Sequence, residues 1–166
     1  MGKELPDFDL MKAYYPTDHD PQKVKRDIGK DVNQDHYKNT CVIRISRAFN
    51  YANHPIPADT AKFRTKQGAD GKWYGLRVSE FRDYMIATYG KPTFTERIGK
   101  KTPIDYSKFA HCHGILCLAV DGWSDATGHF TIWWEDHMLY GEPNYLVRAN
   151  EALLWTTNTR YYTPEV

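Results

Sequence analysis

The sequence predicts an α+β protein, because helical patterns come before strand patterns along the chain. Two helical patterns, over residues 8–15 and 41–51, lie in the first third of the chain. A continuous apolar run over 114–120 and an alternating run over 129–134 lie in the last third, as buried and half-buried strands do. A chain of 166 residues with this order is expected to form a single domain, residues 1–166, in which helices pack on an antiparallel sheet.

Composition and charge exclude several classes of function. The chain is 41% hydrophobic and 26% charged, as globular proteins are. A net charge of +1 predicts no electrostatic binding of nucleic acid. No apolar run reaches the length of about 18 residues that a bilayer span needs, so no membrane insertion is expected. The first eight residues lack an apolar segment, so we expect a protein made in the cytoplasm without a signal peptide.

Three amphipathic helices are expected in the N-terminal part, where apolar side chains recur every three or four positions. They cover residues 8–15, a short segment after Pro21, and residues 41–51. Arg44 and Arg47 fall outside the apolar stripe of the third helix and are expected to face solvent. The stripes consist of Phe8, Met11 and Tyr15 in the first helix, Val24 and Ile28 in the second, and Ile45, Ala48 and Phe49 in the third.

The middle of the chain predicts one strand and one helix. Residues 59–71 are expected to form a loop, and the alternation over 73–78 indicates a strand. Ser79 is a candidate N-cap for the helix that follows, and Gly90 is its expected end. The polar residues 91–108 are expected to form a long connection.

The C-terminal part predicts the sheet. Residues 114–120 are expected to form its buried central strand, and residues 129–134 a strand with alternating faces. Two further strands are expected over 138–140 and 152–156, with antiparallel pairing.

Cys41 is the candidate nucleophile. Thr40 is a good N-cap for the helix that starts at Cys41, because its hydroxyl can accept from a free N–H of the first turn. At that position the N–H groups and the helix dipole favour a thiolate. The Cys41 N–H itself can donate to the oxyanion that forms when the thiolate attacks a carbonyl. The alternative is a buried structural cysteine, since free cysteines are often buried.

His129 is the candidate base, because it opens a strand directly after Gly128, where the tip of a strand is expected to be exposed. A third residue should orient the imidazole. The candidates downstream are Glu142, which we favour, Asp136 as the other candidate, and more remotely Glu135 and Asn144.

No metal or other cofactor is expected. His111, Cys112 and His113 lie close together with Cys117 nearby, but their spacing does not match the usual zinc ligand pairs. Three cysteines leave one over from any disulfide, and Cys112 and Cys117 have opposite parity on a strand.

The same segments carry a resemblance to a known family, the type VI secretion amidase effectors, family 4. The matching segments are residues 39–49, the phrase Gly122-Trp123-Ser124-Asp125-Ala126-Thr127-Gly128-His129 with the strand after it, and the terminal Leu154-Trp155. Residues 8–16 and 72–78 also resemble the pattern of the family. The resemblance therefore spans nearly the whole chain.

This resemblance implies a papain-like fold of the NlpC/P60 type, with a cysteine helix packed on an antiparallel sheet. It implies a toxin of bacterial antagonism, carried by the type VI secretion apparatus into the periplasm of a target cell. There it would hydrolyse the γ-D-glutamyl–meso-diaminopimelate bond of peptidoglycan stem peptides through a thioester. A cognate immunity protein would inhibit it in the producing cell.

By match to the motifs of the family, Cys41 is the nucleophile and His129 the base. The family has an acid in the loop after the histidine strand, and here that loop looks shorter and lacks an obvious Asp, so Glu142 would be a substitution. Asn39, Trp123 and Ser124 are expected to bind substrate, because they neighbour the two motifs.

Two other functions fit a cysteine and a histidine in such settings. A papain-like acyltransferase or deamidase would use the same pair on another amide. A non-catalytic wall-binding module would use the aromatic side chains to stack on glycan and would leave Cys41 unreactive.

Overall fold

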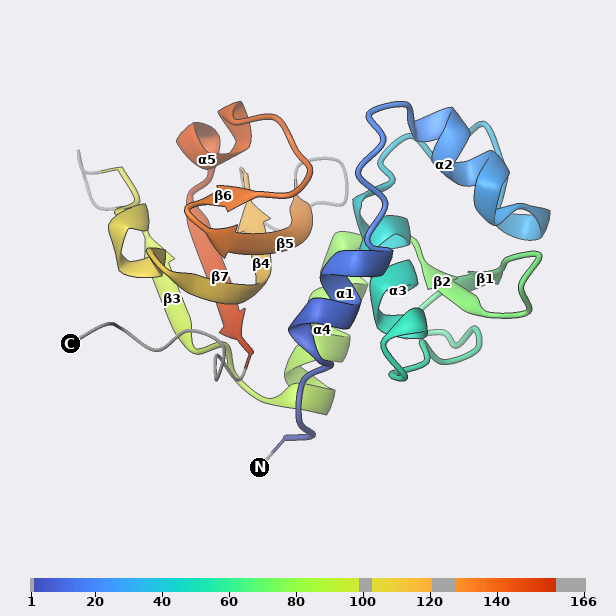
Figure 1. Ribbon diagram of the computed structural model, residues 1–166, viewed down its shortest axis with the longest axis horizontal. Coiled ribbons are helices and arrows are strands. Elements are labelled where there is room, and N and C mark those ends of the chain that lie inside the picture. Colours follow the sequence, from blue (N-terminus) through green and yellow to red (C-terminus); the bar gives the residue numbers. More distant parts are fainter. Residues whose placement is uncertain (1, 99–102, 121–127, 158–166) are drawn as a thin grey trace.

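The computed structural model describes residues 2–98, 103–120 and 128–157, in which most of the helices lie on one side and the main sheet, with α5, on the other (Figure 1). The helices α1, α3 and α4 lie beside the sheet, and α2 and a small hairpin lie beyond them. The elements are α1 (Phe8–Tyr14), α2 (Pro21–Ile28), a 3₁₀ turn (Lys30–Val32), α3 (Cys41–Tyr51), β1 (Thr65–Gln67), β2 (Trp73–Gly75), α4 (Val78–Tyr89), β3 (Phe94–Arg97), a second 3₁₀ turn (Tyr106–Phe109), β4 (Cys112–Ala119), β5 (His129–Glu135), β6 (His137–Met138), α5 (Asn144–Arg148) and β7 (Glu151–Thr156).

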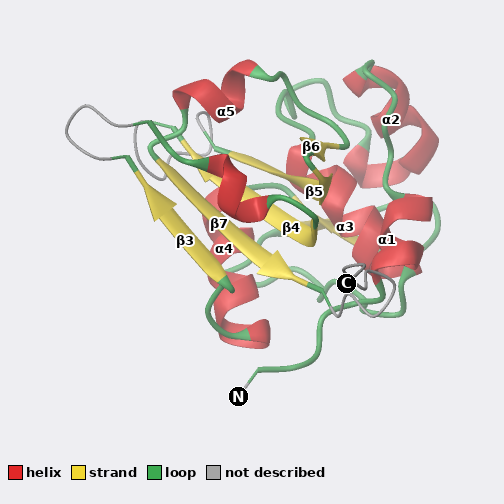
Figure 2. Ribbon diagram, turned by 60° about the vertical axis from the view of Figure 1, so that its left-hand side comes forward, coloured by secondary structure: helices red, strands yellow, loops and turns green. Residues whose placement is uncertain are grey.

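The main sheet has the strand order β3-β7-β4-β5-β6, and all its pairs are antiparallel (Figure 2). The apolar strand β4 lies at its centre, where Cys117 is opposite Phe130 of β5 and Leu153 of β7. The predicted α+β class, the central position of the apolar strand and the antiparallel pairing are confirmed. The start of β5 at His129 is also confirmed, and it places this residue at the edge of the described segment 128–157.

Helix α3 runs through the interior, because α1, β5 and β2 all pack against it. Two of its buried polar side chains hold β2: Ser46 Oγ accepts from the Gly75 N–H at 2.9 Å, and Asn50 Nδ2 donates to the Trp73 carbonyl at 2.7 Å. A buried polar group is tolerated when it is paired in this way. The helix that begins with Cys41 is therefore held from three sides.

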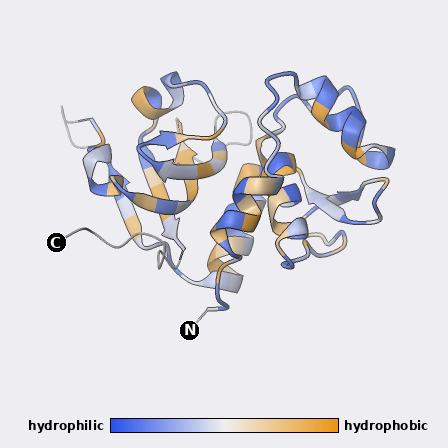
Figure 3. Cartoon of the chain, in the orientation of Figure 1, coloured by the Kyte–Doolittle hydropathy of each residue, from blue (hydrophilic) through white to orange (hydrophobic). Residues whose placement is uncertain are grey.

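Two clusters of the core lie on opposite faces of the sheet, the larger of them between the helices and the sheet, and a third, smaller cluster joins α2, α3 and β2. In Figure 3 the strand β4 between the two clusters has hydrophobic colours, whereas α2 is largely hydrophilic. The large cluster includes Met11, Ile45, Phe49, Phe81, Ile115, Phe130 and Trp155, and the second includes Phe109, Leu116, Trp133, Ala149 and Leu154. The alternation of β5 is confirmed, since Phe130 and Trp133 enter different clusters.

Several expected elements differ in the structure. The strand expected over 73–78 ends at Gly75, because α4 already begins at Val78, so Ser79 lies inside the helix and Arg77 is at its N-cap. The expected loop 59–71 contains β1, and the expected connection 91–108 contains β3. The strand expected over 138–140 is instead the short β6, and α5 was not expected.

In the described part of the chain, none of the helices is both long enough and apolar enough to cross a bilayer.

Candidate active site

The first turn of α3 is capped by Asn39 and not, as expected, by the side chain of Thr40. The Cys41 N–H donates to Asn39 Oδ1 at 3.1 Å, whereas Thr40 Oγ1 accepts from Arg44 Nε at 3.0 Å. Thr40 itself occupies the N-cap position, but it makes no capping bond through its side chain. The hydroxyl of Thr40 is instead used to hold a buried arginine of the same helix.

Asn39 also joins the cysteine helix to the histidine strand. Its Nδ2 donates to the Gly128 carbonyl at 3.3 Å, directly before His129. The backbone N–H of Phe130, directly after His129, acts on the Cys41 thiol and lowers its pKa. The structure therefore brings Cys41 beside the first residues of β5, although 88 positions separate it from His129 in the sequence.

The Cys41 thiol is buried, with 1% of the residue exposed. Burial raises its pKa from 9.0 to about 11, and hydrogen bonds from the Phe130 and Val42 N–H groups and from Asn39 only partly oppose this. The thiolate expected from the helix N-terminus is therefore not favoured. The dipole of a helix contributes at most about 2 kcal/mol, and here the loss of hydration outweighs it.

The His129 imidazole is neutral for the same reason. Only 2% of the residue is exposed, and burial lowers its pKa from 6.5 to about 4. Its Nε2 lies 2.9 Å from the Tyr140 carbonyl oxygen. Since a carbonyl can only accept, Nε2 carries the ring proton, and Nδ1 of the neutral ring is left as the acceptor.

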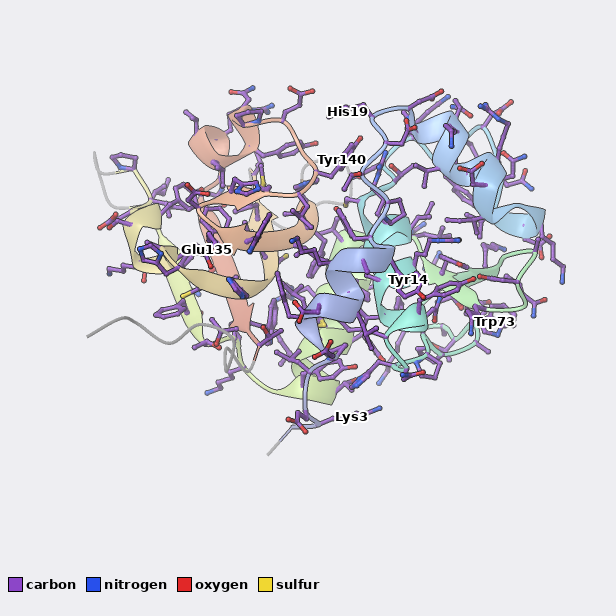
Figure 4. The ribbon with its side chains drawn as sticks, in the orientation of Figure 1. Lys3, Tyr14, His19, Trp73, Glu135 and Tyr140 are labelled. Atoms are coloured by element: carbon purple, nitrogen blue, oxygen red, sulfur yellow. The ribbon has the colours of Figure 1, made fainter. Side chains whose placement is uncertain are left out.

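Two tyrosines enclose this imidazole. The Tyr145 ring, from α5, stacks on it with centroids 4.6 Å apart and planes at 15°. Tyr140 lies in the loop after β6 and faces His19 of the loop between α1 and α2, at a centroid distance of 5.9 Å (Figure 4). The Tyr140 N–H donates to Thr131 Oγ1 at 3.3 Å. Neither tyrosine was expected in the site, because nothing in the sequence pattern after β5 distinguishes them from core aromatics.

Arg44 was expected to face solvent, but it is fully buried. Its Nη1 donates to the carbonyls of Pro16 and Asp18 at 3.1 and 2.6 Å, and its guanidinium lies 3.5 Å from the centroid of the Tyr140 ring. A helix packed on three sides leaves no route to water for a side chain at this position. Oxygens accept from Nε and Nη1, and an aromatic face lies against the guanidinium, whereas the buried Nη2 has no hydrogen-bond partner among the described residues.

A cavity of about 440 Å³ opens beside His129. Asn39 lines it, as expected of a substrate-binding residue, and so does Glu142. Trp123 and Ser124 lie outside the described residues. His19, Lys38, Tyr140, Gly141 and Tyr145 complete much of the lining.

The two candidates for the orienting acid lie in different places. The side chain of Asp136 bonds to Nδ1 of the neighbouring His137 at 2.9 Å, in the turn at the far end of β5 from His129. Glu142 is exposed at the cavity. Among the described residues, the imidazole of His129 is hydrogen-bonded only to the Tyr140 carbonyl. The assignment of Glu142 as the orienting residue stays a prediction.

The cluster around His111 and His113 is built around a carboxylate. Both imidazoles contact Glu135, which lowers the pKa of that carboxyl, and the His113 ring stacks on Phe8. Among the described residues, no group of three or more His, Cys, Asp or Glu side chains could hold a metal ion. Cys112 and Cys117, like Cys41, are free thiols.

Comparison with family models adds the deciding observation. The model described as "Type VI secretion system (T6SS), amidase effector protein 4", Tae4, matches residues 37–155, which is more than half of the chain. The chain belongs to the Tae4 family. It is thus an amidase effector, secreted by the type VI system.

Solved Tae4 structures share the whole fold. Tae4 from Enterobacter cloacae is 26% identical, with a TM-score of 0.80 over 95% of this chain and 100% of that one. Tae4 from Salmonella Typhimurium, in its complex with Tai4, is 27% identical, with a TM-score of 0.79 over 93% of this chain and 100% of that one. A comparison with curated protein sequences gave no match. The expected family and its papain-like NlpC/P60 fold class are confirmed.

Proposed function

We propose that this Tae4 protein is a cysteine amidase that hydrolyses the γ-D-glutamyl–meso-diaminopimelate bond of peptidoglycan stem peptides in the periplasm of a target cell. Residues 1–166 would act as one catalytic domain. The bridge from Asn39 to Cys41 and Gly128 carries the proposal, because it holds the start of the cysteine helix against the start of the histidine strand. The cavity beside His129 offers room for a stem peptide.

The two shifted pKa values support a reaction that starts from a neutral pair. The Cys41 sulfur attacks the γ-glutamyl carbonyl carbon while its proton passes to Nδ1 of His129. The imidazolium then gives that proton to the leaving amine of diaminopimelate, and a thioester remains. His129 next takes a proton from water, which attacks the thioester carbon. The C–S bond breaks, the glutamyl product leaves with a free carboxyl group, and the imidazolium returns its proton to the Cys41 sulfur.

The oxyanion of the reaction needs hydrogen-bond donors, and in the absence of substrate the predicted donor already has an acceptor. The Cys41 N–H, the donor predicted from the sequence, donates to Asn39 Oδ1 in this structure. To serve the oxyanion, it would exchange this acceptor for the carbonyl oxygen of the substrate. Asn39 then has its amide beside the reacting group, consistent with a substrate-binding role.

We also propose an immunity protein as partner. The solved complexes pair Tae4 proteins with Tai4, and in one of them Salmonella Typhimurium Tae4 is bound to Enterobacter cloacae Tai4. A protein that covers the cavity beside His129 would exclude the stem peptide from this chain. Digestion of sacculi with and without a co-purified immunity protein would measure this inhibition.

Purified Gram-negative sacculi, digested with the wild type and with Cys41→Ala, test the reaction. Chromatography with mass spectrometry should find new disaccharide-dipeptide fragments with the wild type alone. A His129→Ala variant should be equally inactive, and circular dichroism should show both variants folded. Undiminished hydrolysis by Cys41→Ala would overturn the proposal.

The same digest identifies the rival functions. Release of ammonia without cleavage would indicate a deamidase, and a product joined to an added amine would indicate an acyltransferase. Sacculi that bind the protein but stay uncut would indicate a wall-binding module.

A further inference from the structure

The Nε2 atom of His129 already has a hydrogen-bond partner in the structure, and this partner is not a side chain. Nε2 bonds to the main-chain carbonyl oxygen of Tyr140 at 2.9 Å. The carboxylate of Glu142, two residues further, makes none of the hydrogen bonds among the described residues. The position that an Asp, Glu or Asn side chain is expected to fill is therefore already occupied.

We propose that the Tyr140 carbonyl is the group that orients His129, and that the stack of the Tyr140 ring on buried Arg44 sets the position of this carbonyl. Tyr140 and Arg44 are then positioning residues, and the inference rests on the proposed function for its role in catalysis. The bond itself fixes the Nε2–H tautomer whether or not the chain cuts peptidoglycan.

A carbonyl in a loop can orient a side chain only if the loop is held, and Tyr140 is held by two further contacts. Its N–H donates to Thr131 Oγ1 at 3.3 Å, and Thr131 Oγ1 is itself hydrogen-bonded at 3.1 Å to the hydroxyl of Tyr15, the C-cap of α1. Its ring covers the Arg44 guanidinium, 3.5 Å from the ring centroid. Arg44 is anchored in turn by Thr40 and by two carbonyls, so the stack ties the loop to α3, the helix of the nucleophile.

The next residue shows how closely the backbone approaches the imidazole. A Cβ atom on Gly141 would lie 2.3 Å from His129 Nε2, and Gly141 has φ of +134°. Only glycine combines this conformation with so little space. The backbone of residues 140–141, and not a side chain, is thus packed against Nε2.

A neutral acceptor also suits the chemistry of the site. A carboxylate would stabilise the imidazolium and favour a charged pair with the thiolate. A carbonyl fixes the same tautomer without a full negative charge, so His129 and Cys41 stay neutral until substrate binds. This agrees with the lowered pKa of His129 and the raised pKa of Cys41.

An ester bond in place of the amide between Tyr140 and Gly141, made by semisynthesis with glycolic acid at position 141, weakens this carbonyl as an acceptor. The N–H that is lost makes no hydrogen bond among the described residues. The tautomer of His129 is read from the ¹⁵N chemical shifts of its ring. We expect Nε2–H in the wild type, a mixed population in the ester, and a kcat lowered at least about fivefold with KM nearly unchanged.

Substitutions of Tyr140 separate the ring from the carbonyl. Tyr140→Phe keeps the stack on Arg44 and should keep the wild-type tautomer, whereas Tyr140→Leu removes the stack and should give the mixed population. Tyr51→Leu, which removes an arginine–tyrosine contact at the other end of α3, should leave kcat unchanged. Glu142→Gln should leave the tautomer of the wild type in place.

Three results would overturn the inference: an Nδ1–H tautomer in the wild type, an ester with unchanged tautomer and kcat, or a tautomer that changes in Glu142→Gln. Failure of the proposed function looks different. In that case the ¹⁵N chemical shifts of the His129 ring change in the ester and in Tyr140→Leu as expected, while the wild-type protein leaves sacculi intact.

Discussion

The rings of His129 and Tyr145 lie face to face, with centroids 4.6 Å apart and planes at 15°. Tyr145 comes from α5, a helix of five residues that follows the loop of Tyr140. The stack covers one face of the imidazole and contributes to the burial that lowers the pKa of His129 to about 4. The charge state of the candidate base therefore depends on a residue outside the expected cysteine–histidine motifs.

Replacement of Tyr145 by Ala should raise the pKa of His129 toward its ordinary value of 6.5. Water would reach the exposed face and solvate the imidazolium. An NMR titration of the ring protons and nitrogens measures the change. Tyr145→Phe keeps the stacked ring and should keep the low pKa, and a low pKa in Tyr145→Ala as well would show that the stack contributes nothing.

Stability should fall on the acidic side because of His129. Its pKa is depressed in the folded state, so the unfolded state binds the proton first as the pH falls. The contribution of neutral His129 to the free energy of unfolding is complete above its unfolded pKa of about 6.5. It is lost as the pH falls through the folded pKa of about 4, and the change is about 3 kcal/mol. Urea unfolding across this range should give a smaller pH dependence for His129→Leu than for the wild type, and equal slopes would contradict the assignment.

Cys41 should make the stability of the fold depend on pH in the opposite direction. Its folded pKa is raised, so its contribution is complete below about 9 and is lost as the pH rises through about 11, by about 3 kcal/mol. Cys41→Ala should remove this alkaline loss in the same unfolding experiment. The difference in ultraviolet absorbance between the wild type and Cys41→Ala would show the titration of this thiol in the folded protein, because the tyrosines and the other two cysteines are common to both.

Gly141→Ala should abolish most of the activity, because its methyl group must displace His129 Nε2. Gly71→Ala is the matched control: Gly71 also has a positive φ, 78°, but an added Cβ would meet nothing within 4 Å. Both variants carry a backbone cost, roughly 1–2 kcal/mol for Gly71 in the left-handed region and roughly 1–3 kcal/mol for Gly141 at φ +134°. Comparable amidase rates for the two variants would show that the approach to His129 does not matter.

Asn39→Ala should lower kcat at least about tenfold and destabilise the fold by about 1 kcal/mol, because it removes a cap and the bridge to Gly128. Asp7→Ala removes a comparable cap, that of α1, far from the site in sequence. It should cost a similar free energy of unfolding while the amidase rate stays at the wild-type level. Equal effects of both variants on the rate would reduce Asn39 to a structural cap.

Much of the fold was predictable, because long periodic segments carry strong signals. The bounds of α3, the start of β5 and the central position of β4 all follow from apolar spacing. The missed elements are short: β1 has three residues, β3 has four and α5 has five. Over such lengths neither the helical nor the strand period repeats often enough to be recognised.

In the candidate site, the sequence could indicate only the residues that a motif marks. Cys41 and His129 stand at the starts of their elements, but the contacts that tune them come from tertiary packing. Arg44 was placed at the surface because charged residues usually lie there, and its burial follows from three neighbours that no local pattern reveals. The group bonded to His129 is a main-chain carbonyl, which every residue has, so residue identity could not indicate it.

The hydrogen bond between Asn39 and Gly128 spans 89 positions of the chain. During synthesis the ribosome therefore releases the segment of Cys41 long before the segment of His129 exists. A contact of such long range forms late, since the intervening chain must first be ordered. The nascent chain therefore carries Cys41 without His129 until residue 129 has been synthesised, and the Cys41–His129 pair that the proposed function requires forms only when β5 joins the sheet.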